Sequence, residues 1–583
     1  MIRVIKKFNR ILSAHQKRMI AVLAVLMLLG GIFEMLGVAM VVPLASAILS
    51  ENLMNNVYVK MIADLLNVTS RKQFVLLMIV ALIVLFIVKN AFLMFQNYFQ
   101  LRFVCNNRYV LQNKMMQLLL HRNYEFYLNH TTSEINTLLD NDIPMTFGLL
   151  TNMLSLFTEL IVSAFLIIAM LVASPALAIG VGAVMLVVVL IIQKAVKPAL
   201  QKASEVTVEG LEKSKKWMLQ AIGGIKEVKV AGKEEFFRER YSDNRLMSLN
   251  AEKTRDMISA FPRMLIEVIG VCGMLGVIAV MILLDKDITQ LWVQMAAFAV
   301  AAIRLLPSAN RISTYINMMT YYEPMLDSVL ENTDLLRQAE EMHKQGIIDN
   351  EIPTGKINTF ADKIALKDIC YHYPNMDKDV LHEACMEIKI GQSVGVKGRS
   401  GAGKTTAIDI LMGLLKPQNG CVMVDGLDIR EDMGGWHKLL SYVPQTIYLI
   451  EDSIRANVAF GVPESEIDDN EVWRALKEAQ LDDFVRSLPG GLDNNIGERG
   501  VRISGGQRQR LGIARALYTN PQVLVFDEAT AALDQETESA IIESINALHG
   551  KKTMIIIAHR LTTIEDCDVI YQVENGKIME TTL

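Results

Sequence analysis

Long apolar runs fill the first half of this 583-residue chain and do not occur in its second half. An α-helix needs roughly 20 apolar residues to cross a bilayer, and each run reaches about that length. The runs therefore predict six transmembrane helices. These cover about residues 19–48, 74–99, 148–172, 176–196, 261–284 and 288–306. Beyond Tyr322 only short apolar stretches remain, such as 523–526, which are too brief to span a membrane and suit buried strands.

Composition excludes several classes of protein. Hydrophobic residues make up 51% of the chain and charged residues 21%, which argues against disorder and against a wholly soluble enzyme. The net charge of −5 gives no reason to expect a nucleic-acid partner. The six cysteines lie far apart without a CxxC pair, so the sequence predicts no metal or disulfide framework.

The chain divides into a membrane domain over residues 1–325, a linker over 326–354 and a compact α/β domain over 355–583. Residues 1–18 hold six Lys and Arg residues and no acid, which places the N-terminus on the cytoplasmic side. After six crossings the C-terminal domain is cytoplasmic as well. The connections 100–147 and 197–260 then lie on the same side, and their charged sequences predict long helices that extend the spans into the cytosol.

A P-loop follows the strand-like segment 392–397 and opens the helix-like segment 405–415. Its glycines turn backbone N–H groups toward phosphate oxygens, Lys404 neutralises them, and Thr405 can bind Mg²⁺. The alternative for such a motif alone is a chance glycine turn. The predicted nucleotide-binding residues are Gly398, Arg399, Ser400, Gly401, Ala402, Gly403, Lys404, Thr405 and Thr406.

Two acids end the apolar strand at 521–528. Asp527 is placed near the Mg²⁺ shell, and Glu528 is left to polarise a water molecule against the γ-phosphate of ATP. Paired acids can also simply cap a strand, but a P-loop in the same domain favours the catalytic interpretation.

Further motifs resemble those of the ATP-binding cassette (ABC) transporters along the whole chain. The segment 503–507 resembles the ABC signature, with Ile503 where leucine is usual, and it adds Ser504, Gly505, Gly506 and Gln507 to the predicted ATP site. The resemblance implies that Tyr373 stacks on adenine, that Gln445 is the Q-loop glutamine and a Mg²⁺ ligand, and that His559 is the switch histidine. The implied fold is a polytopic α-helical membrane domain fused to an α/β P-loop ATP-binding cassette.

The resemblance also implies a homodimer. The signature begins a helix, so its N–H groups and dipole suit the γ-phosphate held by the P-loop of a second copy. Segments 121–132 and 222–233 lie where exporters place the coupling helices that contact the cassettes. Ordinary solvated loops are the alternative for these two segments.

Ionisable residues inside spans are costly and usually face a cavity. Lys89, Arg263 and Arg304 would give a dimer a basic cavity suited to phosphate or pyrophosphate, although Arg263 and Glu267 could simply pair. The segments 261–270 and 304–311 resemble the PglK family of bacterial lipid-linked oligosaccharide flippases. Lys89 stands where that pattern has arginine, which keeps the charge and loses the bidentate fork.

This resemblance implies ATP-driven flipping of a polyprenyl-pyrophosphate oligosaccharide across the bacterial inner membrane, in support of protein glycosylation. Two alternatives stay open. One is an exporter of drugs, other lipids such as lipid A, or peptides. The other is a member of the family that gates a channel or regulates a partner without pumping.

Overall fold

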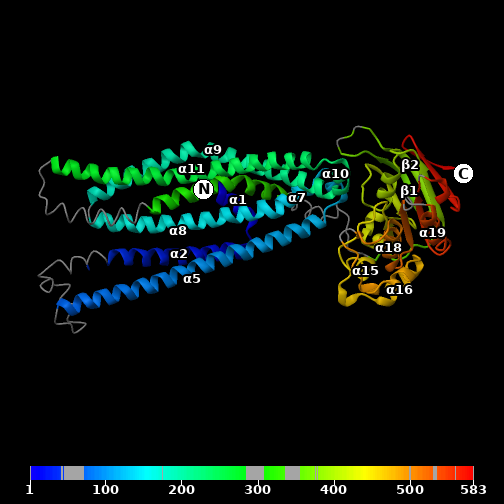
Figure 1. Cartoon of the computed structure of the whole chain (residues 1–583), viewed down its shortest axis with the longest axis horizontal. Helices are drawn as coiled ribbons and strands as arrows, with labels where there is room; N and C mark the ends of the chain where they lie inside the picture. Colours follow the sequence, from blue (N-terminus) through cyan, green and yellow to red (C-terminus); the bar gives the residue numbers. More distant parts are fainter. Residues whose placement is uncertain are drawn as a thin grey trace. The chain divides into compact units, whose positions relative to one another are not determined.

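The computed structural model describes residues 2–40, 44, 71–173, 175–283, 307–334, 355–374, 376, 378–497, 500–528, 535–558 and 560–581. These residues form two compact units. The first comprises Met1–Arg122 and His130–Arg337, and the second comprises Asn123–Asn129 and Gln338–Leu583. The first unit is helical and the second is an α/β domain, which confirms the predicted fold class (Figure 1).

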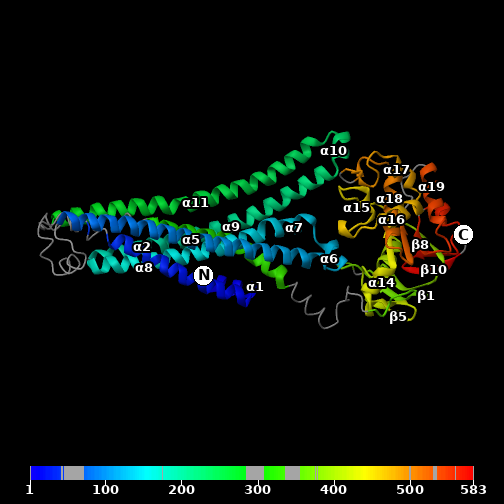
Figure 2. The ribbon, with the colours of Figure 1, turned by 90° about the horizontal axis from the view of Figure 1, so that it is seen from below.

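The first unit contains long helices joined by short ones. It consists of α1 (Ile2–Ile11), α2 (Ala14–Ala39), α5 (Arg71–Leu120), α7 (Thr132–Thr137), the π-helical turn η2 (Leu138–Asp142), α8 (Ile143–Ala173), α9 (Pro175–Gly223), α10 (Ile225–Ala231), α11 (Glu234–Leu283) and a helix over residues 307–334. The helices α5, α9 and α11 have 50, 49 and 50 residues. At 1.5 Å per residue each is about 75 Å long, far more than the hydrocarbon core of a bilayer. These helices continue without a break past the apolar segments, as the sequence predicts (Figure 2).

Within the described part of the chain, three helices are long and apolar enough to cross a bilayer, over Ala14–Gly37, Lys72–Leu120 and Thr132–Phe165. They contain most of the first three predicted spans. The predicted span 176–196 falls within α9, and residues 261–283 of the predicted span 261–284 fall within α11. The sixth predicted span, 288–306, lies outside the described residues.

Among the residues that the structure describes, ion pairs join α2 to α5 and α8 to the helix over 307–334. Lys89 Nζ on α5 lies 2.7 Å from Glu34 Oε2 on α2. The guanidinium of Arg311, in the helix over 307–334, donates two hydrogen bonds of 2.9 and 2.8 Å to the carboxylate of Glu159 on α8. Each pair connects a different pair of helices. Glu34, Lys89 and Glu159 lie within predicted apolar spans, whereas Arg311 lies just beyond the sixth predicted span.

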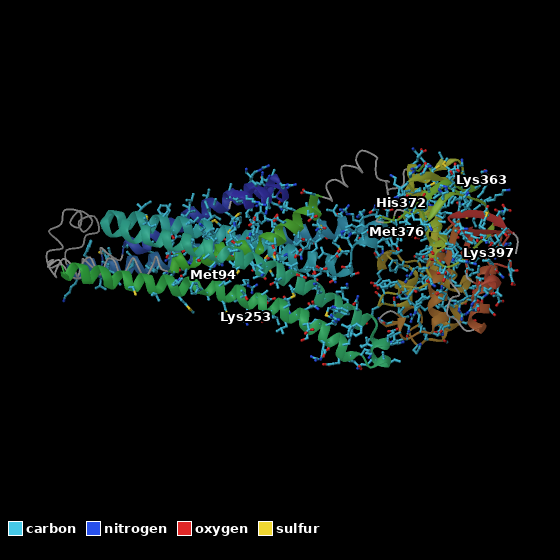
Figure 3. All side chains as sticks on the ribbon, turned by 90° about the horizontal axis from the view of Figure 1, so that it is seen from above. Met94, Lys253, Lys363, His372, Met376 and Lys397 are labelled. Atoms are coloured by element: carbon cyan, nitrogen blue, oxygen red, sulfur yellow. The ribbon has the colours of Figure 1, made fainter. Side chains whose placement is uncertain are left out.

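The surface of α5 is largely apolar. Leu76, Val80, Ile83 and Ile87 are each more than half exposed, and Met94, labelled in Figure 3, is 78% exposed. Exposed apolar side chains at this density suit contact with lipid tails or with another apolar protein surface.

The second unit contains two sheets. The sheet with the order β2-β1-β4-β5 is antiparallel, and the sheet with the order β10-β9-β3-β8-β7-β6 is parallel except for its β9–β10 hairpin. The strands are β1 (Lys363–Tyr371), β2 (Leu381–Lys389), β3 (Ser393–Gly398), β4 (Asn419–Val424), β5 (Leu427–Asp428), β6 (Leu440–Val443), β7 (Val523–Asp527), β8 (Thr553–Ile557), β9 (Val569–Glu574) and β10 (Lys577–Thr581). All five residues of β7 are buried, as expected for a central parallel strand.

Helices pack on these sheets and bury two apolar cores. One core joins both sheets to the P-loop helix, and the other lies among α15, α16, α18 and the strands β7 and β8. The helices are α6 (Tyr124–Asn129), α13 (Lys404–Leu411), α14 (Met433–Leu439), α15 (Ile454–Val458), α16 (Asp469–Glu478), α17 (Asp482–Ser487), α18 (Gly505–Tyr518) and α19 (Gln535–Asn546), with 3₁₀ turns η3 (Ile429–Glu431), η4 (Glu464–Glu466), η5 (Gly491–Asp493) and η7 (Leu561–Thr563).

The Glu34–Lys89 pair predicts a large loss of stability when one charge is removed. Lys89 is 4% exposed, so Glu34→Ala leaves a buried cation unpaired, at a cost of about 3–5 kcal/mol. Thermal denaturation of the purified protein in detergent should show a clearly lower midpoint. Glu209→Ala is the control, because it breaks the exposed Lys213–Glu209 pair and should cost about 0–1 kcal/mol. Equal shifts in the two variants would contradict the buried pairing.

Candidate functional site

The P-loop follows β3, a strand that is paired with a neighbouring strand on each side. β3 pairs in parallel with β8 and with β9, and Val394 and Val396 are buried in the core. Gly401 and Gly403 have φ values of 76° and 104°, and a residue with a side chain would be strained in this conformation. A Cβ at Gly398 would lie 2.5 Å from the backbone oxygen of Val573. The glycines are therefore required by the backbone path as well as by an approaching phosphate.

Lys404 and Thr406 lie at the start of α13, where Gly403 is the N-cap. The Lys404 ammonium is 5% exposed and donates to the backbone oxygens of Gly398 and Arg399 at 3.0 and 3.2 Å. The hydroxyls of Thr406 and Tyr373 lie 3.0 Å apart. Two residues predicted to contact opposite ends of ATP are thus connected directly.

The acids at the end of β7 meet the predicted Q-loop glutamine. Gln445 Nε2 donates a 2.6 Å hydrogen bond to Glu528 Oε2. Glu528 has φ 48°, a backbone conformation that residues other than glycine rarely adopt. Its N–H donates a hydrogen bond to the backbone oxygen of Ile557 at 2.9 Å. Backbone strain of this kind is often kept at functional sites. The geometry brings together two of the three residues predicted to be catalytic. The third, His559, lies outside the described residues.

Asp527 is 7% exposed, and Tyr442 donates its hydroxyl hydrogen to Asp527 Oδ2 at 3.2 Å. Burial and the neighbouring Asp527 carboxylate raise the pKa of Tyr442, so this tyrosine remains a donor at neutral pH. The sequence analysis did not identify Tyr442, although it lies three residues before Gln445 in the same segment.

Asp409 is a second residue that sequence reasoning missed. It lies on α13, and burial together with the charge of Asp527 raises its pKa from 3.8 to about 7. The signal was available, because Asp409 is the only charged residue in the apolar segment 405–415.

The signature segment forms a helix N-terminus as expected. Ser504 Oγ accepts from the N–H of Gln507 at 3.2 Å, and the Gln507 side chain accepts from the N–H of Ser504 at 2.9 Å. This capping box defines the start of α18, where Gly505 is exposed. A helix N-terminus of this kind suits an anion.

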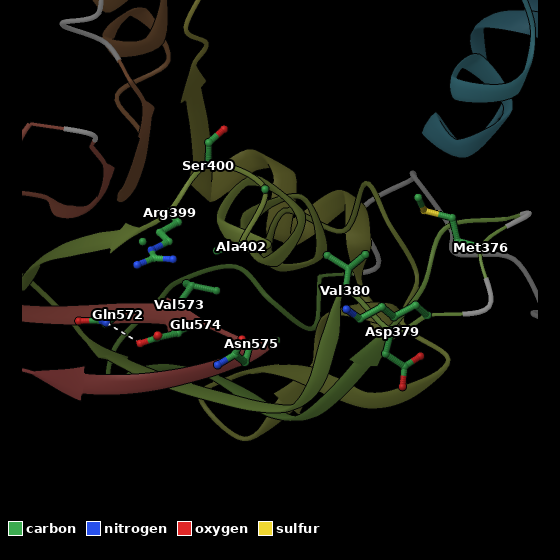
Figure 4. Close-up of a pocket in the computed structure, with 14 residues that line it drawn as sticks. Met376, Asp379, Val380, Arg399, Ser400, Ala402, Gln572, Val573, Glu574 and Asn575 are labelled. Atoms are coloured by element: carbon green, nitrogen blue, oxygen red, sulfur yellow. Dashed lines mark hydrogen bonds between the residues drawn. The ribbon is translucent and has the colours of Figure 1, made fainter.

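A cavity of about 800 Å³ runs along the outer edge of the P-loop (Figure 4). Its walls are Gly398–Ala402, the β9–β10 turn and the loop near Val380. Gln572 donates to Glu574 at 2.9 Å on the β9 wall, and Arg399 lies on the P-loop wall. The volume is sufficient for a nucleotide, but Lys404 and Thr405 do not line the cavity, so it accounts for only part of an ATP site.

The residues predicted to line a substrate cavity are placed unequally. Lys89 is buried on α5, bound to Glu34 and 4.7 Å from the centre of the Phe86 ring. Arg263 lies on α11. Arg304 lies outside the described residues. The structure adds Arg311, whose side chain stays 51% exposed while it binds Glu159.

Each predicted coupling segment contains a short helix that follows a long one. Segment 121–132 contains α6, and segment 222–233 contains α10. α6 is grouped with the second unit, whereas the chain on both sides of it belongs to the first unit.

Comparison with known proteins gives consistent matches over both units. A family model described as ABC transporter matches residues 381–531, and one described as ABC transporter transmembrane region matches residues 44–303. An ATP-dependent lipid A-core flippase of Saccharophagus degradans is 30% identical over 518 residues, which cover 86% of this chain and 83% of that protein. A protein of the same description from Methylobacillus flagellatus is 30% identical over 392 residues, covering 66% of this chain and 64% of that protein.

A solved structure described as a bacterial Atm1-family ABC exporter with ATP bound has the same fold, with a TM-score of 0.71 and 22% sequence identity. The match covers 97% of this chain and 94% of the solved one.

Removing the predicted base should separate binding from hydrolysis. Glu528→Gln keeps the shape of the side chain and an acceptor for Gln445 but lacks the carboxylate, so we expect turnover to fall by roughly 10²–10⁴-fold with ATP still bound. Lys404→Ala should instead raise the Kd for ATP. Phosphate release and equilibrium binding measure the two effects. Wild-type turnover in Glu528→Gln would contradict the assignment of the base.

The raised pKa of Asp409 predicts a pH-dependent stability. The folded protein binds the Asp409 proton more tightly than the unfolded chain, so this residue lowers stability as pH rises from about 4 to about 7. Asp409→Asn should flatten that part of the curve and raise the thermal midpoint at pH 8. The midpoint of the nucleotide-free protein, measured across this range for both forms, checks the expectation, and parallel curves would refute it.

Proposed function

The chain belongs to the ABC transporter family as an exporter-type half-transporter that hydrolyses ATP, and we propose that its homodimer flips a polyprenyl-pyrophosphate oligosaccharide across the bacterial inner membrane. Two ion pairs inside the helical unit, Glu34–Lys89 and Glu159–Arg311, are the main support for a cargo with a charged head group. Charged groups between membrane helices are costly and mark a polar route. The apolar surface of α5 suits a lipid tail that stays in the bilayer while the head group moves.

The cations in this region suit an anionic head group. Arg311 presents half of its side chain to the surroundings, and Arg263 and Arg304 would add two further guanidinium groups. Arginine binds phosphate through two parallel hydrogen bonds. Lys89 differs, because Glu34 already neutralises it. In this proposal Lys89 contributes to head-group binding only when Glu34 releases it.

ATP hydrolysis uses residues at the ends of β3 and β7. The P-loop holds the phosphates, and Glu528 polarises the attacking water while Gln445 holds its carboxylate in place. His559 would act as the switch histidine near the γ-phosphate, and Tyr373 would stack on adenine.

The chain offers hard oxygen donors that suit Mg²⁺: the Thr405 hydroxyl, the Asp527 carboxylate and the amide oxygen of Gln445, whose nitrogen is the atom that contacts Glu528. When bound there, Mg²⁺ would neutralise charge on the phosphates.

Two features support a second copy as the partner. The signature backbone at Gly505 and Gly506 suits a phosphate, which in this proposal is held by the P-loop of the other copy. The tip of the α9–α11 hairpin carries exposed apolar side chains among charged ones, with Ile222 at 61%, Ile225 at 48% and Val230 at 91% exposed. We assign this tip to the cassette of the partner. In this proposal both cassettes lie in the cytoplasm, the side on which a basic N-terminus is usually found.

A second candidate cargo is lipid A attached to core sugars, and the names of the two bacterial relatives favour it. Both cargoes combine a phosphate-bearing glycan with apolar chains. They differ in the lipid anchor, so the choice between them requires a transport measurement.

Purified protein in vesicles provides that measurement. With a labelled polyprenyl-pyrophosphate oligosaccharide on the cassette side, we expect ATP-dependent appearance of label on the opposite side, and little movement of labelled lipid A-core. Arg304→Ala should abolish flipping while basal ATPase activity stays within about twofold, and Arg304→Lys should retain part of the flipping because the charge remains. Unchanged flipping by Arg304→Ala would refute the head-group role, and transport of lipid A-core alone would favour the second cargo.

A further inference from the structure

We propose that the hydroxyl group of Tyr371 connects α6 to the nucleotide site, so that Tyr371 is a positioning residue through which bound ATP sets the position of α6. The proposal requires only ATP binding by the cassette. It is independent of the cargo proposed above, and the two can fail separately.

The first contact lies at the end of β1. The Tyr371 hydroxyl donates a 3.1 Å hydrogen bond to Glu125 Oε1 on α6. The Tyr371 residue is 0% exposed and packs in the core that contains the P-loop helix. A buried phenol needs a polar partner, and α6 supplies a carboxylate. The ring of Tyr371 therefore packs in the cassette core, while its hydroxyl group binds α6.

The charge state of this contact is stable. Burial, and after it the charge of Glu125, raises the pKa of Tyr371 above its ordinary value of 10.0. The hydroxyl therefore keeps its proton at neutral pH and remains the donor. Hydrogen bonds to charged acceptors are roughly twice as strong as neutral ones, which makes this contact a strong attachment for a helix of six residues.

The second contact joins Tyr371 to the predicted adenine-stacking residue. The rings of Tyr371 and Tyr373 meet edge to face, with centroids 5.2 Å apart and an interplanar angle of 83°. Aromatic pairs favour this geometry, and a shift of one ring displaces the other in a close-packed core.

The third contact reaches the P-loop helix. The hydroxyls of Tyr373 and Thr406 are 3.0 Å apart, and Thr406 follows Lys404 and Thr405 on α13. Glu125, Tyr371, Tyr373 and Thr406 thus form a continuous chain of contacts from α6 to the P-loop. An adenine ring that stacks on Tyr373 would therefore contact the middle of this series of contacts.

A neighbouring residue of α6 faces the same region. Burial, Asp409 and Tyr373 all raise the pKa of Tyr124, so Tyr124 lies within the electrostatic field of the P-loop helix and of the adenine side. The grouping of residues Asn123–Asn129 with the cassette is consistent with these attachments. Because coupling between two sites is reciprocal, a displacement of α6 should also change the affinity for ATP.

Hydrogen exchange of the full-length protein in lipid nanodiscs tests the proposal. In the Glu528→Gln background, where ATP stays bound, saturating ATP should slow amide exchange over residues 123–129. Tyr371→Phe keeps the ring and removes only the hydroxyl, and we expect it to reduce the ATP-dependent slowing at least threefold. Glu125→Ala should have the same effect, and the double variant should add little because both changes break one contact.

Tyr571→Phe is the matched control. Its hydroxyl also belongs to a buried tyrosine of the cassette and donates to the Glu387 oxygen at 2.9 Å, but it does not contact α6. This control should keep the full response of residues 123–129 to ATP. Kd values for ATP measured in parallel ensure that every variant is saturated and folded.

The proposal is overturned if ATP leaves exchange over residues 123–129 unchanged in the parent, or if Tyr371→Phe responds as the parent does. It is also overturned if Tyr571→Phe loses the response to the same extent, because the hydroxyl of Tyr371 would then only stabilise the cassette.

Discussion

The parallel pairing of β3, β8 and β7 is the constraint on which the nucleotide site depends. Parallel strands end at one edge of their sheet, so β3 delivers the P-loop and β7 delivers Asp527 and Glu528 to the same side. The five buried residues of β7 hold this arrangement in the core. The hydrogen bond from Gln445 to Glu528 then adds β6, which pairs with β7, to the same edge. The parallel pairing of these strands therefore brings together the residues that are predicted to bind and hydrolyse ATP.

Local sequence predicted those parts of the site whose chemistry is local. The P-loop, the strand before it, the acids after β7 and the helix after the signature all appear where the sequence placed them. Each depends on residues that are adjacent in the chain, such as glycines that require positive φ or an apolar run bounded by acids. The long helical extensions of the spans were predictable for the same reason, since charge and helix propensity continue without a break from the apolar run.

Contacts between distant residues were not predictable from one sequence. The sequence suggests Lys89 as a cation of the substrate cavity, whereas the structure pairs it with Glu34, 55 positions earlier. No periodicity connects residues on two different helices, and the choice of partner depends on how α2 and α5 pack. Asp409 and Tyr442 were missed because burial in the folded cassette, and after it the charge of Asp527 on β7, raises the pKa of each. The segment around α6 was identified, but its attachment to Tyr371 depends on a core that only the folded cassette forms.

The position of α6 has a consequence for biosynthesis. Glu125 and Tyr371 are separated by 246 residues, so the ribosome releases α6 long before the strand that will bind it. At about 5–20 residues per second, the delay is on the order of ten seconds to a minute. During that time the neighbouring hydrophobic helices can enter the membrane, although β1, which α6 will contact, has not yet been synthesised. The emerging cassette then completes its fold against a helix that has already been synthesised, so the order of translation makes α6 available before β1.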